Sequence, residues 1–271
     1  MNAALVRACT RDGAGGSPTA VLDEGPFTDA ERRALPARLG ASHAVFAQTR
    51  DDGSLSLRFF TAAGELPACG HGTIAALALF AHRHRSGAYR LRAGGREFHG
   101  WTEVSAGRIR AAFDPGPVAL RDPDPDAARA VLAALGTGAD PGGLRVAGVG
   151  RERLLVPIGG PAALADLAPD FGRLRAACDA AGLLGCYAYA PLPGTGRFAA
   201  RMFAPSIGVD EDIANANSTV CLTAHLGAAV EVDMGDALGR PATIAGDLGR
   251  RAEGLGLRLG GTAVVDREVA L

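Results

Sequence analysis

Two loops that each lead into a helix rich in small residues occur at matching places in the two halves of the chain. Cys69–Ile74 reads Cys-Gly-His-Gly-Thr-Ile and Asn215–Val220 reads Asn-Ala-Asn-Ser-Thr-Val, with threonine fifth in both. In each half we expect the same order of elements, namely strands, a helix, more strands, then the loop and its helix. The pattern therefore predicts an α/β (α+β) protein built from two related domains.

The stretch Asp114–Pro117, Asp-Pro-Gly-Pro, is the best candidate for a linker between these domains. It predicts an N-terminal domain over residues 1–115 and a C-terminal domain over 116–271. The last strand, at about 262–271, can return to complete the first domain. With 271 residues and 48% hydrophobic content, the chain can fill two cores of moderate size.

Charge and hydropathy exclude several classes of partner. The net charge is -1, which provides no electrostatic footprint for nucleic acid or an anionic membrane. No apolar run approaches the roughly 20 residues that span a bilayer, and Met1–Arg7 reads as a strand and not as a signal peptide. We therefore expect a cytoplasmic protein.

Cysteine usage and the choice of basic residue indicate the cellular context. The five cysteines contain no CxxC pair and are odd in number, so we expect reduced thiols and neither a disulfide framework nor a zinc site. All 28 positive charges are arginine, which together with abundant alanine and glycine suggests a GC-rich bacterial genome. Such bacteria are often rich in secondary metabolism.

A polar loop delivered onto a helix N-terminus is suited to binding a carboxylate or phosphate, because backbone N–H groups and the helix dipole both favour an anion. Gly70 and Gly72 would let the backbone approach a ligand closely. An ordinary helix cap is the alternative for either loop alone. Two such loops at matching positions favour a symmetric clamp around one small acid.

Groups that move protons near neutral pH occur in and beside these loops: Cys69, His71, Asp212 and Glu65. Histidine alone has an ordinary pKa close to neutrality, about 6.5. Cys69 at a helix N-terminus can be more acidic than a free thiol. A cysteine in an alanine-rich stretch is, however, more often a small core residue.

Three motifs resemble the PhzF family. Gly16–Val21 is similar to that family's Gly-Asn-Pro-x-Ala-Val, and Phe60–His71 is similar to its Phe-Thr-Pro-x-x-Glu-Leu-Pro-x-x-Gly-His. Arg201–Asp212 resembles its Arg-x-Phe-x-Pro followed by Gly-x-x-Glu-Asp. Order and spacing hold from end to end.

The resemblance implies a diaminopimelate-epimerase-like fold, with two pseudo-symmetric domains around a central cleft and each domain a curved mixed sheet around a helix. It further implies a homodimer that works on a small carboxylic acid without metal or cofactor. The best-known activity of the family is isomerisation of a dihydro-hydroxyanthranilate, in which a carboxylate shuttles a proton. More distant relatives are two-thiol amino-acid epimerases.

The chain departs from the family in the motifs that line the cleft. The catalytic glutamate of the family lies in Ser-Glu-x-x-Phe, on a loop after the first helix. Here Ser42–Phe46 reads Ser-His-Ala-Val-Phe, so His43 replaces the glutamate. Ser17 replaces the asparagine of the first motif, and Asn215 and Asn217 stand where the family has threonine and serine. These changes indicate a differently shaped substrate.

We therefore expect His43 to be the base, because a neutral imidazole can accept a proton and return it elsewhere, as a carboxylate does. His71 would orient or polarise the substrate, or donate a proton, and Asp212 would position the substrate or a protonated group. The expected substrate contacts are Ser17, Cys69, Gly70, Gly72, Thr73, Asn215, Asn217, Ser218 and Thr219. No metal is expected.

The leading hypothesis is a cofactor-independent isomerase that shifts a double bond in a small unsaturated cyclic acid of secondary metabolism. A precursor of 4-alkylproline units and a dihydro-hydroxyanthranilate-like acid are the candidate substrates. A two-thiol epimerase is less favoured, because Asn215 stands opposite Cys69 and Cys221 lies about a turn and a half further along its helix. A non-catalytic protein that binds a small acid remains the other alternative.

Overall fold

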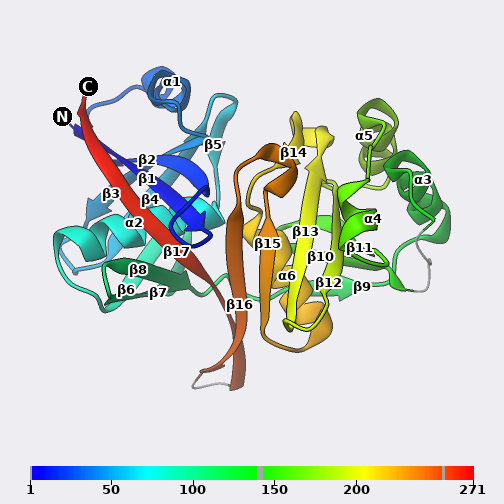
Figure 1. Cartoon of the computed structure of the whole chain (residues 1–271). Coiled ribbons are helices and arrows are strands. Elements are labelled where there is room, and N and C mark those ends of the chain that lie inside the picture. The colour runs from blue at the N-terminus through cyan, green and yellow to red at the C-terminus, as the bar shows by residue number, and fades with distance from the viewer. Residues whose placement is uncertain (1, 139–142, 252–253) are drawn as a thin grey trace. The chain divides into compact units, whose positions relative to one another are not determined.

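The structure, a computed structural model, describes residues 2–138, 143–251 and 254–271. Strands and helices mix throughout, as expected for the predicted α/β class. The chain divides into two compact units (Figure 1). The first unit comprises 1–115, 240–243 and 258–271, and the second comprises 116–239 and 244–257. Among the helices of these ranges, none is long and apolar enough to cross a membrane.

The first unit is a ring of strands that closes on itself. Hydrogen-bonded neighbours follow the order β1, β2, β3, β4, β6, β7, β8 and β17, and β17 pairs again with β1. The pairs β2–β3 and β4–β6 are parallel and the others are antiparallel. The strands are β1 (Asn2–Thr10), β2 (Ser17–Asp23), β3 (His43–Thr49), β4 (Leu55–Thr61), β6 (Ala88–Ala93), β7 (Arg96–Ser105), β8 (Arg108–Phe113) and β17 (Gly254–Ala270).

Helix α2 (Gly70–Arg83) lies inside this ring and contacts β1, β2, β3, β7 and β8. Its residues 70–79 and 81 are all buried, which explains why the sequence of this helix is apolar on every face. Gly100 of β7 permits the close approach, because a Cβ there would lie 2.9 Å from methyl carbons of Leu77. The ring thus holds the N-terminus of α2 in a fixed place.

Helix α1 (Asp29–Leu39) packs outside the ring, where Leu35 joins the apolar outward side chains of β1 to β4. A capping box begins the helix, since the Thr28 side chain accepts from the backbone N–H of Glu31 and the Glu31 carboxylate accepts from the backbone N–H of Thr28. The helix runs through Pro36 and ends at Gly40, whose φ of 65° is left-handed.

In the second unit, neighbouring strands follow the order β9, β10, β11, β12 and β13, and β13 also pairs with β14 and β15. Helix α6 (Ala216–Leu226) lies against β10 and β15. The other elements are β9 (Ala119–Arg121), β10 (Arg145–Val149), β11 (Arg151–Pro157), β12 (Cys186–Leu192), β13 (Arg197–Ala204), β14 (Val209–Asp212), β15 (Val230–Met234), β16 (Ala242–Arg251), α3 (Pro125–Leu135), α4 (Pro161–Ala165), α5 (Phe171–Ala180) and the 3-10 helices Pro205–Ile207 and Asp236–Leu238.

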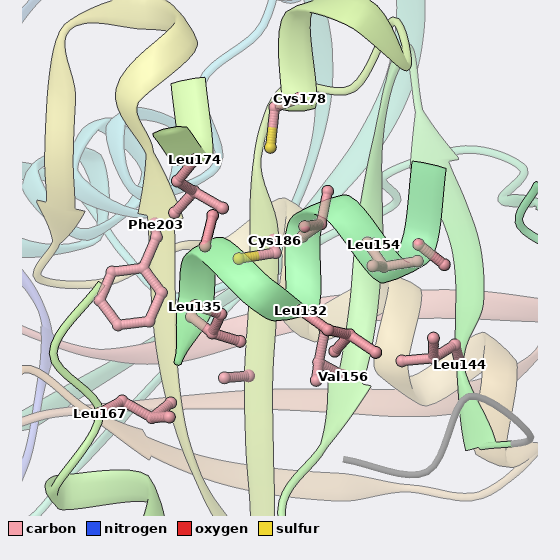
Figure 2. Close-up of a cluster of buried hydrophobic side chains, with 14 of the residues drawn as sticks. Leu132, Leu135, Leu144, Leu154, Val156, Leu167, Leu174, Cys178, Cys186 and Phe203 are labelled. Carbon is pink, nitrogen blue, oxygen red and sulfur yellow. The ribbon is translucent and has the colours of Figure 1, made fainter. Parts of the chain in front are cut away.

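A large apolar core of the second unit lies between its sheet and the helices α3 and α5 (Figure 2). Leu132 and Leu135 of α3 meet Leu154 and Val156 of β11 in this cluster, and all four are buried. Burying a leucine side chain contributes roughly 1.5–3 kcal/mol. This face of the sheet is therefore covered by α3 and α5, and the other face is available to α6.

An arginine–glutamate pair precedes the central helix in both units. Arg58 of β4 donates two hydrogen bonds, of 2.8 and 2.7 Å, to Glu65 of β5 (Gly64–Leu66). Arg201 of β13 donates two, of 3.0 and 2.7 Å, to Glu211 of β14. The same bidentate pair at the same place in each half is a structural trace of the repeat that the sequence suggested.

From the polar and small residues before each helix, the sequence predicts loops over 62–72 and 204–217, and both ranges are wrong. The first contains β5 and gives way to helix at Gly70, and the second contains a 3-10 helix and β14 and gives way to helix at Ala216. Glycine and polar residues fill the first helical turns, where backbone N–H groups need no intrahelical partner, so apolar periodicity starts too late to mark the boundary.

Candidate active site

The first unit brings His43, Cys69 and His71 together at one end of α2. His43 is the first residue of β3 and pairs with Thr19 of the parallel strand β2, so it does not lie on the loop that the motif suggested. Cys69 is the N-cap of α2 and His71 is the second residue of the helix. Strand pairing and a helix start therefore fix all three backbones, which is how rigid sites are built.

The two imidazoles are in direct contact. Nε2 of His71 lies 2.8 Å from Nδ1 of His43, within hydrogen-bond distance, and the rings meet edge to face at 77°. Sγ of Cys69 lies 3.6 Å from the same nitrogen of His71. Cys69 is 6% exposed and His71 is 7% exposed, whereas His43 is half-buried. His43 is thus the member of the cluster that a substrate can reach most readily.

Burial lowers the pKa of His71 to about 4. Desolvation disfavours the charged imidazolium, so His71 is neutral near pH 7. A neutral imidazole has one nitrogen that donates and one that accepts a hydrogen bond. His71 can therefore accept a hydrogen from His43, or donate one to it, but does not itself carry positive charge in the site.

Ser42, which the sequence did not single out as a site residue, extends the cluster. Its Oγ lies 3.0 Å from Nδ1 of His43 and 3.0 Å from Oγ of Ser17, and it donates to the carbonyl of Pro18 at 2.8 Å. Ser17, predicted as a substrate contact, is 2% exposed and belongs to this network. From the sequence, only its position next to His43 in the Ser-His-Ala-Val-Phe motif could have indicated Ser42 as a site residue.

His43, Cys69 and His71 are also a possible donor set for a metal ion, because one ligand atom from each lies within 4.8 Å of the others. Two imidazoles and a thiolate would suit zinc. The 2.8 Å separation of the two imidazole nitrogens is, however, the length of a hydrogen bond, with a proton where a metal would have to stand. The geometry therefore fits a proton-transfer cluster better.

The glycines and the threonine at the start of α2 have packing roles. A Cβ on Gly72 would lie 3.0 Å from Sγ of Cys69 and from a ring carbon of Phe59, so only glycine fits easily between helix and sheet. Thr73 is 2% exposed and its hydroxyl donates to the carbonyl of Cys69 at 2.8 Å. Gly70 is the buried first residue of the helix. Contacts of these residues with a substrate stay predictions.

In the second unit, Asp212 and Asn215 organise the N-terminus of α6. Asn215 is the N-cap and accepts from the backbone N–H of Ser218 at 2.9 Å, while its amide nitrogen donates to Asp212 at 2.9 Å. This carboxylate therefore holds the cap of the helix. Asn217 is half-buried at the second position of the helix.

Ser218 and Thr219 are fully buried, and both hydroxyls contact groups of the second unit. Oγ of Ser218 donates to the sulfur of Met202 at 3.4 Å. Oγ1 of Thr219 lies 3.0 Å from the hydroxyl of Tyr187, whose pKa burial raises. Both hydroxyls are thus engaged within the protein, and contacts of these two residues with a substrate stay predictions.

Glu65, considered from sequence as a proton-moving group, is paired with Arg58. The side-chain hydrogen bonds from Arg58 lower the pKa of this carboxyl below its usual value. A carboxylate held ionised in this way is a weak base for a substrate proton. Glu65 is therefore a weaker candidate for proton transfer than His43 or His71, whose roles stay predictions.

Comparison with known proteins identifies the family and the relatives of this chain. The family model described as "Phenazine biosynthesis-like protein" (PhzC-PhzF) matches residues 6–268. An uncharacterised isomerase of Deinococcus radiodurans is 30% identical over 96% of this chain and 90% of its own length. A trans-2,3-dihydro-3-hydroxyanthranilate isomerase of Pseudomonas aeruginosa is 31% identical over 92% of this chain and 89% of its own.

The crystal structure of a PhzF-family phenazine biosynthesis protein of Bacillus anthracis superposes with a TM-score of 0.87 at 15% identity, covering 100% of this chain and 98% of that one. This likeness confirms the epimerase-like fold expected from the motifs. The family match over nearly the whole chain and relatives named as isomerases lead to one conclusion: the chain belongs to the phenazine biosynthesis-like PhzC-PhzF family and is an isomerase.

Proposed function

We propose that this isomerase shifts a double bond in a small unsaturated cyclic carboxylic acid, with His43 as the proton-transferring residue and no cofactor. His43 takes an allylic or α proton from one carbon, and the same proton or its equivalent is returned to another carbon of the extended anion. The observation that carries the proposal is the 2.8 Å contact between His43 and a buried, neutral His71. That contact supports a base whose charge changes during turnover.

The substrate class rests on the relatives and on the start of α2. The P. aeruginosa relative is named for a dihydro-hydroxyanthranilate, which is a small unsaturated cyclic acid. The first turn of α2 offers backbone N–H groups beside His43, and the side chain of its N-cap Cys69 makes no capping hydrogen bond. Such a helix start favours a carboxylate or an enolate-like oxygen.

Within that class we propose an acid of bacterial secondary metabolism, either dihydro-hydroxyanthranilate-like or a pyrroline carboxylate on the way to a 4-alkylproline unit. The replacement of the glutamate of the family by His43, and the asparagines at 215 and 217, support a substrate of different shape. Asp212 would position it. A homodimer in the cytoplasm is part of the same proposal.

The test is isomerisation in D2O, followed by NMR, with trans-2,3-dihydro-3-hydroxyanthranilate and an alkylidene pyrroline carboxylate as probes. The expected result is movement of the double bond together with deuterium at the carbon that receives the proton. Deuterium at a stereocentre without a double-bond shift would instead indicate an epimerase. Tight binding of both probes with no exchange would indicate a protein that only binds small acids.

A further inference from the structure

The contacts of His43 determine which of its ring nitrogens carries the hydrogen. We propose that Ser42 is a positioning residue which, with His71 as hydrogen-bond acceptor, holds His43 with its hydrogen on Nδ1, so that Nε2 exchanges the proton with the substrate. This inference rests on the proposed role of His43 as the base. The hydrogen is assigned from the heavy-atom contacts by the following argument.

Ser42 has one hydroxyl hydrogen and three neighbours to which it could be directed. The carbonyl of Pro18, at 2.8 Å, is the nearest and can only accept. The same carbonyl accepts the backbone N–H of Ser42 at 2.8 Å, which a carbonyl with two lone pairs can do. Two bonds to one carbonyl fix Ser42 in place with its hydrogen pointing away from His43.

The oxygen of Ser42 then presents lone pairs to its other two neighbours. Oγ of Ser17 lies 3.0 Å away and donates its own hydrogen, and Nδ1 of His43 lies 3.0 Å away and has to carry a hydrogen to make a favourable contact. In the opposite tautomer, a nitrogen lone pair would face an oxygen lone pair. The serine pair therefore selects the Nδ1–H form of His43.

His71 is the second acceptor for that hydrogen. Its Nε2 lies 2.8 Å from Nδ1 of His43, and a neutral imidazole accepts there when its own hydrogen is on Nδ1. The Nδ1–H of His43 thus lies between two acceptors, Ser42 and His71. The lone pair of neutral His43 is then on Nε2.

This arrangement also suits the step in which His43 gains a proton. When Nε2 takes the proton from substrate carbon, the C–H electron pair stays on the substrate anion, and the imidazolium keeps its Nδ1–H. That hydrogen bond to neutral His71 becomes charge-assisted, hence stronger. If His71 donated to Nδ1 instead, it would offer the imidazolium no acceptor. The observed contacts therefore favour a base that acts through Nε2.

The test combines imidazole 15N–1H NMR of the whole protein, at a pH where His43 is neutral, with kinetics of Ser42 variants. Wild type is expected to show His43 protonated on Nδ1. Ser42→Ala is expected to move His43 towards the Nε2–H tautomer. It should also lower kcat by about fivefold, which corresponds to the loss of one net hydrogen bond, and leave KM nearly unchanged. Ser42→Thr, which keeps the hydroxyl, should restore both readouts, and the exposed Ser105→Ala should change neither.

An Nε2–H tautomer in wild-type protein would overturn the inference, and so would an unchanged tautomer in folded Ser42→Ala. The NMR readout does not need a substrate. A protein that shows the expected tautomers but no isomerisation would therefore contradict the proposed function and leave the hydrogen assignment standing. Thermal unfolding of each variant identifies any that fails to fold, and if Ser42→Ala fails, the tautomer of His43 in wild-type protein still decides the assignment.

Discussion

Nε2 of His71 lies 2.8 Å from Nδ1 of His43, although 28 residues separate the two in the chain. His43 begins a strand of the ring and His71 lies in the first turn of the helix inside it, so the contact exists only because both elements start at the same end of the unit. A pair built on two rigid elements keeps its geometry during turnover. This relationship joins His43 to the cluster at the start of α2.

Replacing His43 by alanine is expected to lower turnover by roughly 10²- to 10⁴-fold, which is the usual contribution of a general base. His43→Glu introduces the carboxylate that the resemblance to the family predicts at this position, and it should retain more activity than the alanine variant. The exposed His82→Ala serves as the control and should match wild type. Steady-state kinetics on the substrate found by the D2O assay provide the measurement, and wild-type turnover in folded His43→Ala would disprove the role of this residue.

Stability is expected to fall in mild acid because of His71. Its folded pKa is lowered to about 4, so above pH 6.5 both folded and unfolded chains hold it neutral and it has no effect. Between pH 6.5 and 4 the unfolded chain binds the proton first, which favours unfolding by up to about 3 kcal/mol at the acid end. Below pH 4 the penalty is constant.

Urea denaturation at several pH values measures this effect. His71→Asn removes the titrating group and should flatten the fall in the free energy of unfolding between pH 6.5 and 4. His82→Asn, a change at an exposed position of the same helix, should keep the slope of wild type. A slope that survives in folded His71→Asn would mean that another group is responsible.

Chelation is expected to leave the enzyme unchanged. The cluster of His43, Cys69 and His71 has donor atoms within 4.8 Å of one another, so a metal is chemically conceivable there. Since the imidazole nitrogens are at hydrogen-bond distance, we expect dialysis against EDTA to alter neither turnover nor Tm. Loss of activity on dialysis with recovery on adding Zn²⁺ would mean that His43 is a ligand and not the base.

The repeat could be predicted from sequence because it is local. In the segments that begin at Cys69 and Asn215, the threonine four residues later donates from its hydroxyl to the carbonyl of the first residue, at 2.8 Å in Thr73 and 3.2 Å in Thr219. Both contacts lie within one helical turn, so matching residues at matching spacing are enough to indicate them.

Contacts across elements could not be predicted in this way. The proposed role of Ser42 depends on the direction of one hydroxyl hydrogen towards the carbonyl of Pro18, which belongs to β2, far from Ser42 in the chain. The packing role of Gly72 depends on how closely α2 approaches Phe59 of β4. The residue types indicate which side chains could belong to the site. Which of these side chains are in contact depends on the register of β2 with β3 and on how closely α2 approaches the sheet.

The two arginine–glutamate pairs are expected to differ in their contribution to stability, although their geometry is alike. The side chains of Arg201 and Glu211 are 13% and 8% exposed, against 37% and 43% for Arg58 and Glu65. Removing one charge of a buried pair leaves the other uncompensated, whereas an exposed pair contributes under about 1 kcal/mol. Glu211→Gln should therefore lower the free energy of unfolding by about 3 kcal/mol, and Glu65→Gln by less than about 1 kcal/mol.

The guanidinium of Arg201 is also anchored by the carbonyls of Leu164, Ala165 and Leu167, at 3.2, 3.2 and 2.8 Å, so it cannot easily turn to water when Glu211 is neutral. Urea denaturation of the two matched variants compares the pairs directly, and equal losses would show that burial does not separate them. The larger loss at Glu211 would mean that the repeated pair has become structural in the second unit, because there the arginine connects β13 and β14 to the C-terminal end of α4 and to Leu167.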